Sequence, residues 1–244
     1  MAEPRPLFDL DPVLPRAELG ARFARDGRVQ VVDLLTAESA ESLHDVLDRQ
    51  TDWGIGWQAG RQTPGGLRGA QLRAMTPAAR GALSQQAAAA AGAGDFAFVY
   101  GRYPIVDAYL QGWDPGHPLD LVLEYINAEP MLELVRQVTG DGSLIKADAQ
   151  ATLFAPGHFL TTHDDSVDAE GRRIAYVLNM SRDWRPDWGG YLLFYDENDD
   201  ILAGVRPRFN TLNLFRVPMR HNVSYVPPFA PVGRYAITGW FRDR

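Results

Sequence analysis

Three residues in the C-terminal half of the chain have the types and spacing of a metal site. His163 and Asp165 lie two residues apart in HFLTTHDDSVDAEG, and His221 follows 58 residues later in RHNVSY. In an extended strand, side chains two residues apart project from the same face, so His163 and Asp165 are predicted to share one ion while Asp164 points away. Hairpins between the two segments are expected to bring His221 back alongside them.

Two imidazoles and one carboxylate suit more than one metal chemistry. A facial triad of this kind leaves three positions of an octahedral ion open, which suits Fe(II) oxygenases that bind a co-substrate and oxygen together. Zinc hydrolases use similar ligands but need one open position and usually a nearby carboxylate base. A His-x-Asp pair also occurs by chance as a surface pair or a cap. The spacing alone therefore leaves these interpretations open.

Arg234 narrows the choice between these chemistries. It begins the segment RYAITGWF, 13 residues after His221. In a strand it shares one face with Ala236, Thr238 and Trp240. An arginine among aromatic residues is often a surface side chain or an ion-pair partner. A buried guanidinium, however, holds a carboxylate through two parallel hydrogen bonds, so Arg234 near an iron site would anchor the far carboxylate of 2-oxoglutarate.

Composition limits the class of protein. The 244 residues are 45% hydrophobic with no apolar run long enough to cross a bilayer, which predicts a soluble chain with one main core and no membrane contact. No cysteine is present, so His, Asp and Glu are the available strong metal ligands. A net charge of −7 without a clustered basic face argues against nucleic acid as a general partner. The start MAEPRPLFDL does not have the pattern of an export signal, so a cytoplasmic location is expected.

The elements that must position these residues fall into two parts of one predicted domain, residues 1–244. Residues 1–144 are predicted to be mainly helical support with some strands. The expected helices lie around Leu19 and Phe23 up to Gly27, from Thr36 through Asp48, over 78–91 after a Thr76 cap, and in two pieces across 119–138 separated by Pro130. A strand is expected at 28–35, and residues 60–69 are interpreted as a mobile loop that could act as a lid.

Residues 145–244 carry the strand pattern. Seven strands are predicted near 145–154, 158–163, 172–180, 190–195, 208–215, 220–226 and 234–241, with the acidic DENDD at 196–200 as a hairpin tip. Many short strands after a helical prefix indicate an α+β protein with a mainly β core. The expected architecture is a double-stranded β-helix, or jelly roll, with supporting N-terminal helices.

The motifs of this second part resemble the 2-oxoglutarate-dependent prolyl hydroxylases, both the hypoxia-sensing type and the ribosome-modifying, translation-termination type. The resemblance covers about residues 145–242. It rests on the order of F-x-x-G-x-x-L-x-x-H-D-D (154–165), EGRRIAYVL (170–178), RDW (182–184), P-R-F-N-x-L-x-L-F (207–215), His221 and RYAITGWF (234–241). HDD and EGRRIA are closest to the ribosomal type, whereas RYAIT is similar to the hypoxia-sensing type.

The resemblance implies an Fe(II)- and 2-oxoglutarate-dependent dioxygenase supported by ascorbate. Iron would be bound by His163, Asp165 and His221, and the co-substrate by Arg234 with Asn179 and Thr238. Oxygen would be consumed as 2-oxoglutarate is converted to succinate and a C–H bond is hydroxylated, without a general base from the protein. The expected substrate is a prolyl residue of a protein or peptide that enters over residues 58–72. Free proline, another small molecule, or a catalytically silent jelly-roll binding module are the alternatives.

Two positions depart from the family pattern. A tyrosine that hydrogen-bonds the co-substrate tail has Asn179 as its counterpart, which retains a donor, and a second tyrosine has Phe154, which retains none. Outside the triad, His158 is expected in a loop or turn, and His44 and His117 show no metal spacing. Core or strand packing is expected for Trp184, Trp188 and Trp240, and solvated positions for at least two of Arg172, Arg173 and Arg220.

Overall fold

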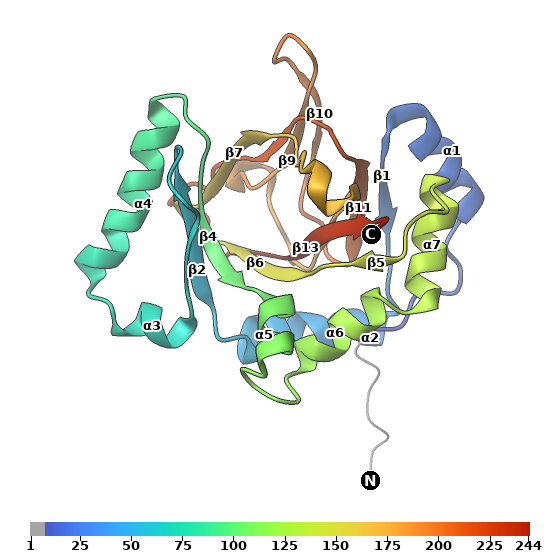
Figure 1. Ribbon diagram of the computed structural model, residues 1–244, viewed down its shortest axis with the longest axis horizontal. Coiled ribbons are helices and arrows are strands. Elements are labelled where there is room, and N and C mark those ends of the chain that lie inside the picture. Colours follow the sequence, from blue (N-terminus) through green and yellow to red (C-terminus); the bar gives the residue numbers. More distant parts are fainter. Residues whose placement is uncertain (1–7) are drawn as a thin grey trace.

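The computed structural model describes residues 8–244, in which the strands form one curled antiparallel sheet with helices around it (Figure 1). The strands are β1 (Arg28–Val32), β2 (Gly54–Ala59), β3 (Gly65–Leu67), β4 (Ala97–Tyr103), β5 (Lys146–Ala147), β6 (Gln150–Phe154), β7 (Phe159–His163), β8 (Arg172–Asn179), β9 (Leu192–Tyr195), β10 (Ile201–Val205), β11 (Thr211–Arg216), β12 (His221–Val223) and β13 (Arg234–Arg242). Their order is β1-β11-β8-β13-β6-β4-β7-β12-β9-β10, with β2 paired to β4, β3 to β2, and β5 to β13. This is the expected jelly roll.

The helices come mainly from the first 140 residues, as expected. They are α1 (Arg16–Asp26), α2 (Ala37–Asp45) continued by the π-helical turn η1 (Val46–Gln50), α3 (Gly69–Ala74), α4 (Pro77–Gly92), α5 (Ile105–Gln111), α6 (Pro118–Ile126) and α7 (Glu129–Thr139), with short 3-10 turns η2 (Asp168–Glu170) and η3 (Pro186–Trp188). No helix within residues 8–244 combines the length and the apolarity needed to span a bilayer. The chain start used for the export-signal expectation lies largely outside the described residues.

The helix ends follow the local signals. α1 ends at Gly27, whose φ of 65° is the left-handed conformation that glycine adopts without strain. Thr36 and Thr76 cap α2 and α4, because the hydroxyl of each accepts a hydrogen bond from the backbone N–H three residues later. Pro130 lies in the first turn of α7, where a missing N–H costs no helical hydrogen bond.

Strand alternation divides the core into two sides of the sheet. On β8, Ile174, Tyr176 and Leu178 belong to the large cluster that packs against the helices. Ala175 and Val177 instead face the inside of the roll, with Phe215 and Leu192. Because successive side chains of a strand point to opposite faces, one strand supplies both the helix-packing core and the lining of the roll. Residues that line the roll are therefore those available to a functional site.

Several boundaries differ from the expectations. The segment 145–154 forms two separate strands, β5 and β6. β10 was not predicted, and its first residues, Ile201 and Leu202, are both exposed, so they do not alternate between buried and exposed positions. The segment 60–69 is not wholly a loop, because Gly65–Leu67 pairs with β2. The largest difference is β4, which lies between β6 and β7 and pairs with both, so the first half of the chain contributes a strand to the middle of the sheet.

Candidate metal centre and its cavity

His163 and Asp165 come together, but not through the extended backbone that the sequence suggested. β7 ends at His163, and Asp165 has a φ of 63°, in the left-handed region that aspartate tolerates better than most residues. Asp164 stabilises this bend, since its Oδ1 accepts a hydrogen bond from the N–H of Ser166 at 3.0 Å. The turn carries the Asp165 carboxylate to 3.3 Å from Nε2 of His163.

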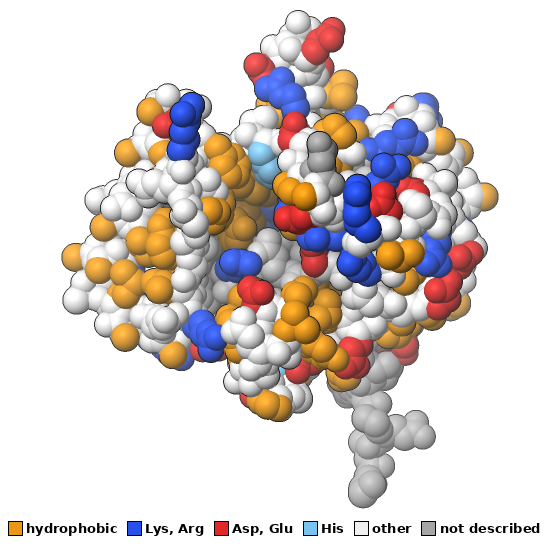
Figure 2. All heavy atoms as spheres, in the orientation of Figure 1, with side chains coloured by type: hydrophobic (Ala, Val, Ile, Leu, Met, Phe, Trp, Pro, Cys, Tyr) orange, Lys and Arg blue, Asp and Glu red, His pale blue; other side chains and the backbone are white. Residues whose placement is uncertain are grey.

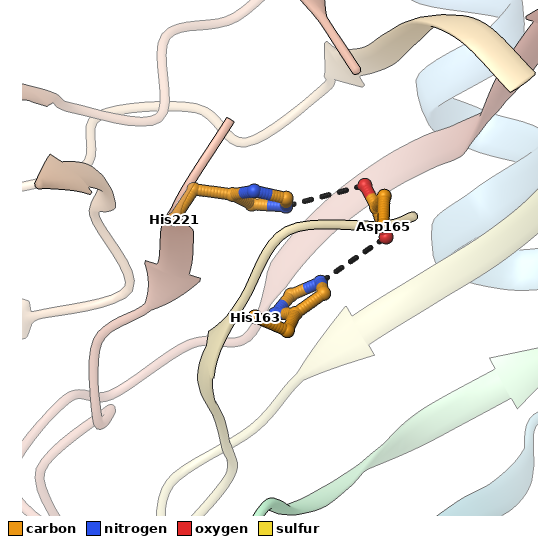
Figure 3. A group of neighbouring side chains, drawn as sticks. All are labelled: His163, Asp165 and His221. Atoms are coloured by element: carbon orange, nitrogen blue, oxygen red, sulfur yellow. Dashed lines mark ion pairs between the residues drawn. The ribbon is translucent and has the colours of Figure 1, made fainter. Parts of the chain in front are cut away.

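His221 reaches the same point through the sheet. It begins β12, which lies between β7 and β9, and its Cα is in register with that of His163. Its Nε2 lies 3.4 Å from Oδ2 of Asp165, and both imidazole rings point at this carboxylate (Figure 3). One nitrogen of each histidine and the carboxylate oxygens lie within 4.8 Å of one another. The expected grouping of His163, Asp165 and His221 is thus present in the structure.

Hydrogen bonds set the tautomer of both histidines. Nδ1 of His163 lies 3.0 Å from the carbonyl of Thr161, and Nδ1 of His221 lies 2.7 Å from the carbonyl of Met219. Because a carbonyl only accepts, Nδ1 carries the proton and the Nε2 lone pair of each ring faces the carboxylate. Carbonyl partners of this kind orient metal-binding histidines in proteins.

The charge states also suit a cation. The pKa of His221 is lowered to about 4, mainly by burial. The neighbouring His163 also lowers this pKa, and its effect is larger than the increase caused by the Asp165 carboxylate. The imidazole is therefore neutral near pH 7. Burial acts to raise the pKa of Asp165, but its contacts with His163 and His221 outweigh this and lower it, so the carboxylate is ionised. Two neutral imidazole nitrogens and one carboxylate form a donor set that would hold a divalent ion such as Fe(II).

Arg234 lies on the inner face at the start of β13. Only 1% of the residue is exposed. Its Nε and Nη2 donate to Oδ1 of Asn179 at 3.2 and 3.0 Å, and its guanidinium lies 5.3 Å from the centre of the Phe154 ring. Burial lowers its pKa to about 10, so it remains a cation at neutral pH. No carboxylate within residues 8–244 forms an ion pair with Arg234, which leaves a buried positive charge that an anionic ligand would neutralise.

One cavity of about 910 Å³ contains the three-residue cluster and Arg234. Thr238 and Trp240 line it from β13, as the alternation of that strand predicted. Trp240 packs against the core cluster inside the roll, as expected, and it also forms a cavity wall, with the guanidinium of Arg172 over its ring at 3.7 Å. Arg172 lines this wall as well, so it is not merely a solvated charge.

β4 supplies a wall that sequence reasoning missed. Phe98, Tyr100 and Arg102 alternate along this strand and line the cavity, and Phe96 precedes them. Tyr100 is buried and stacks on Phe154 with ring centres 5.0 Å apart. The alternation in AFVYGRY was a usable strand signal, but nothing local in it showed that this strand would enter the sheet beside the metal-site strand β7.

The remaining histidines have structural roles. His158 lies in the loop between β6 and β7, where its Nδ1 is 3.1 Å from both the backbone N of Ala155 and the carbonyl O of Leu153. His117 caps α6 through Leu119, and His44 contacts the carbonyl of Met180. Among the described residues, these three histidines lie outside the group formed by His163, Asp165 and His221.

In one cavity, the jelly roll therefore gathers two histidines, an aspartate and an arginine that has no ion-pair partner among residues 8–244. Residues 149–242, less than half of the chain, match the model of the 2OG-Fe(II) oxygenase superfamily. The match agrees closely with the span of the resemblance predicted from the motifs.

Parts of the chain are similar in sequence to named hydroxylases and their relatives. Prolyl 3-hydroxylase OGFOD1 of Mus musculus is 38% identical over 89 residues, which are 34% of this chain and 16% of that protein. Egl nine homolog 1 of Homo sapiens is 25% identical over 142 residues, 55% of this chain and 32% of that protein. The chain therefore matches less than a third of the length of either relative.

Among solved structures, a Pseudomonas putida prolyl-4-hydroxylase superposes with a TM-score of 0.59 at 19% identity, covering 94% of this chain and 99% of that one. At this identity the likeness concerns the fold. The likeness in fold covers nearly the whole chain, more than residues 149–242.

Proposed function

We propose that this protein is an Fe(II)- and 2-oxoglutarate-dependent dioxygenase that hydroxylates a prolyl residue of a protein or peptide. The observation that carries the proposal is the presence, in one cavity, of the His163, Asp165 and His221 donors together with a buried, uncompensated Arg234. A metal site alone would suit several chemistries. The positive charge of Arg234 favours a co-substrate that binds the metal at one end and presents a carboxylate at the other.

Each residue then has a defined task. His163, Asp165 and His221 would hold Fe(II), and Arg234, oriented by Asn179, would bind the distal carboxylate of 2-oxoglutarate. Bound iron and 2-oxoglutarate supply the oxidising chemistry when both are present. Phe98 and Phe154 line the same cavity and would exclude water from the site, and Thr238, also in its lining, would contact the co-substrate.

The prolyl substrate is supported by relatives whose names carry that activity, the mouse prolyl 3-hydroxylase above all. We propose that the chain works as one domain, because β4 from the first half forms a wall of the cavity. Oxygen and ascorbate would support turnover. We also propose that the reaction takes place in the cytoplasm.

The test is succinate formation from 2-oxoglutarate with Fe(II) and ascorbate, measured with proline-containing peptides, with free proline and without substrate. The proposal expects succinate in all iron-containing samples and oxygen added to a peptide by mass spectrometry. Oxygen added to free proline alone would make the protein a small-molecule hydroxylase. Activity with Zn(II) that ignores 2-oxoglutarate would indicate a hydrolase, and iron binding without succinate a silent binding module.

A further inference from the structure

A second cavity of about 550 Å³ adjoins the metal cavity. The two share Arg102, Pro104 and Asp107, at the end of β4 and the start of α5. Figure 2 shows a continuous hollow on this face, which runs down from the pale blue histidine between hydrophobic walls to a region with both basic and acidic side chains. Both volumes fall in the range of about 300–1,000 Å³ typical of ligand sites, so the second is large enough to hold a ligand of its own.

The backbone of Gly65 and Gly66 borders the passage between the cavities. Gly56 of β2 pairs with Tyr100 of β4 on one side and with Gly66 of β3 on the other. Gly56 is buried, with a side-chain atom of Arg102 3.2 Å from the position of a Cβ, whereas Gly66 is exposed. Gly65 lines the metal cavity, whereas Gly66 lines the second one. A Cβ added at Gly66 would meet nothing nearer than Nη1 of Arg102 at 3.7 Å, so the space above it is open. Glycine permits close approach by another chain.

The edge of β3 is also available. Within residues 8–244, β3 pairs with β2 alone, so its other edge has backbone N–H and C=O groups without a neighbouring strand. An extended peptide adds to such an edge through backbone hydrogen bonds, which bind any sequence, while side-chain pockets nearby provide selectivity. β3 borders both cavities, so a chain along it would pass from one to the other.

The far wall of the second cavity is preorganised. The guanidinium of Arg68 lies 3.5 Å from the centre of the Trp113 ring, and both side chains donate to Oε1 of Gln111. The lining contains three aspartates and two arginines, so it has no excess of positive charge. This disfavours a phosphate-rich ligand such as nucleic acid and suits a neutral or basic polypeptide.

We propose that the second cavity is a subsite for a polypeptide substrate, occupied by residues on one side of the residue that is oxidised. The inference rests on the proposed function. The chain runs from the metal cavity over Gly65 and Gly66, along the edge of β3, into the space walled by Arg68 and Trp113. A free amino acid would fill the metal cavity only, so the second cavity would serve no purpose for it.

The test compares two synthetic peptide mixtures of equal molar concentration. One has a proline with five random residues on each side, and the other has one random residue on each side. We expect wild-type protein to oxidise the long mixture at least ten times faster. Gly66→Val should reduce oxidation of the long mixture at least tenfold, because its side chain fills the passage, while succinate formed without peptide stays unchanged.

Gly142→Val is the matched control, because Gly142 also has open space around its Cβ and lines neither cavity. It should behave as wild type, and thermal unfolding should show that both variants fold. Trp113→Ala should slow oxidation of the long mixture and leave the short mixture unchanged. Equal rates for the two mixtures, an unaffected Gly66→Val, or succinate without oxidation of any peptide would each overturn the inference. Absence of succinate under every condition would instead refute the proposed function.

Discussion

Asn179 accepts two hydrogen bonds from Arg234 through a single oxygen, Oδ1, at 3.2 Å from Nε and 3.0 Å from Nη2. Both side chains are almost fully buried. The contact orients the guanidinium without neutralising it, because an amide carries no net charge. The positive charge of Arg234 thus stays available to a ligand.

Asn179→Asp should therefore weaken 2-oxoglutarate binding at least tenfold. The substitution places a carboxylate of nearly the same shape where the amide lies, so Arg234 gains an internal counter-ion that competes with the co-substrate. Calorimetric titration of the metal-loaded protein with 2-oxoglutarate measures the effect. Metal affinity should be unaltered, since Asn179 does not belong to the triad, and an unchanged 2-oxoglutarate affinity would contradict the role given to Arg234.

The triad predicts a metal-dependent stability. Fe(II) added without oxygen should stabilise the folded protein and so raise the midpoint of thermal unfolding. At a hundredfold excess of Fe(II) over its dissociation constant, the free energy of unfolding should increase by about 2.7 kcal/mol. His163→Ala and His221→Ala should abolish this shift and succinate formation, and chelation should reverse it in the wild type. His158→Ala is the control, because His158 lies near in sequence but outside the cluster. A full shift in either triad variant would exclude these ligands.

We expect the hydroxyl of Tyr100 to provide the hydrogen bond to 2-oxoglutarate that Phe154 cannot donate. The Tyr100 ring stacks on Phe154 within the metal cavity, and burial raises the pKa of its hydroxyl, which remains a donor at neutral pH. Tyr100→Phe should raise the KM for 2-oxoglutarate roughly three- to tenfold, the value of one hydrogen bond. The double variant Tyr100→Phe with Phe154→Tyr should recover part of this loss. An unchanged KM in the single variant would assign Tyr100 to packing alone.

Acid should destabilise the metal-free protein. The pKa of His221 is about 4 in the folded protein because of burial, against an ordinary value of 6.5, so unfolding takes up a proton between these values. Stability is therefore fully present above pH 6.5 and falls as the pH decreases toward 4, by up to roughly 3 kcal/mol for this group. Urea unfolding at several pH values measures the slope. His221→Gln should flatten it, and an equal slope in both proteins would place the proton uptake elsewhere.

Much of the site was predictable because its signals are local. Three of these signals depend only on neighbours along the chain. They are the metal-binding residue types, the alternation that puts Arg234 and Thr238 on one face of a strand, and the helix caps at Thr36 and Thr76. The jelly roll followed from the strand pattern after residue 145. Asp165 shows the limit of such reasoning, since its proximity to His163 was expected from an extended strand but arises from a left-handed turn.

By itself, the sequence determined which residues are proposed to bear the chemistry, His163, Asp165, His221 and Arg234, and the order of the strands that carry most of them. Only the tertiary structure decided what surrounds these residues. β4 comes from the first half of the chain, yet it pairs with β6 and β7, and it brings Tyr100 and the passage over Gly66 to the cavity. Strand pairing between distant segments depends on how their side chains pack across the sheet, so no local pattern in the chain specifies it.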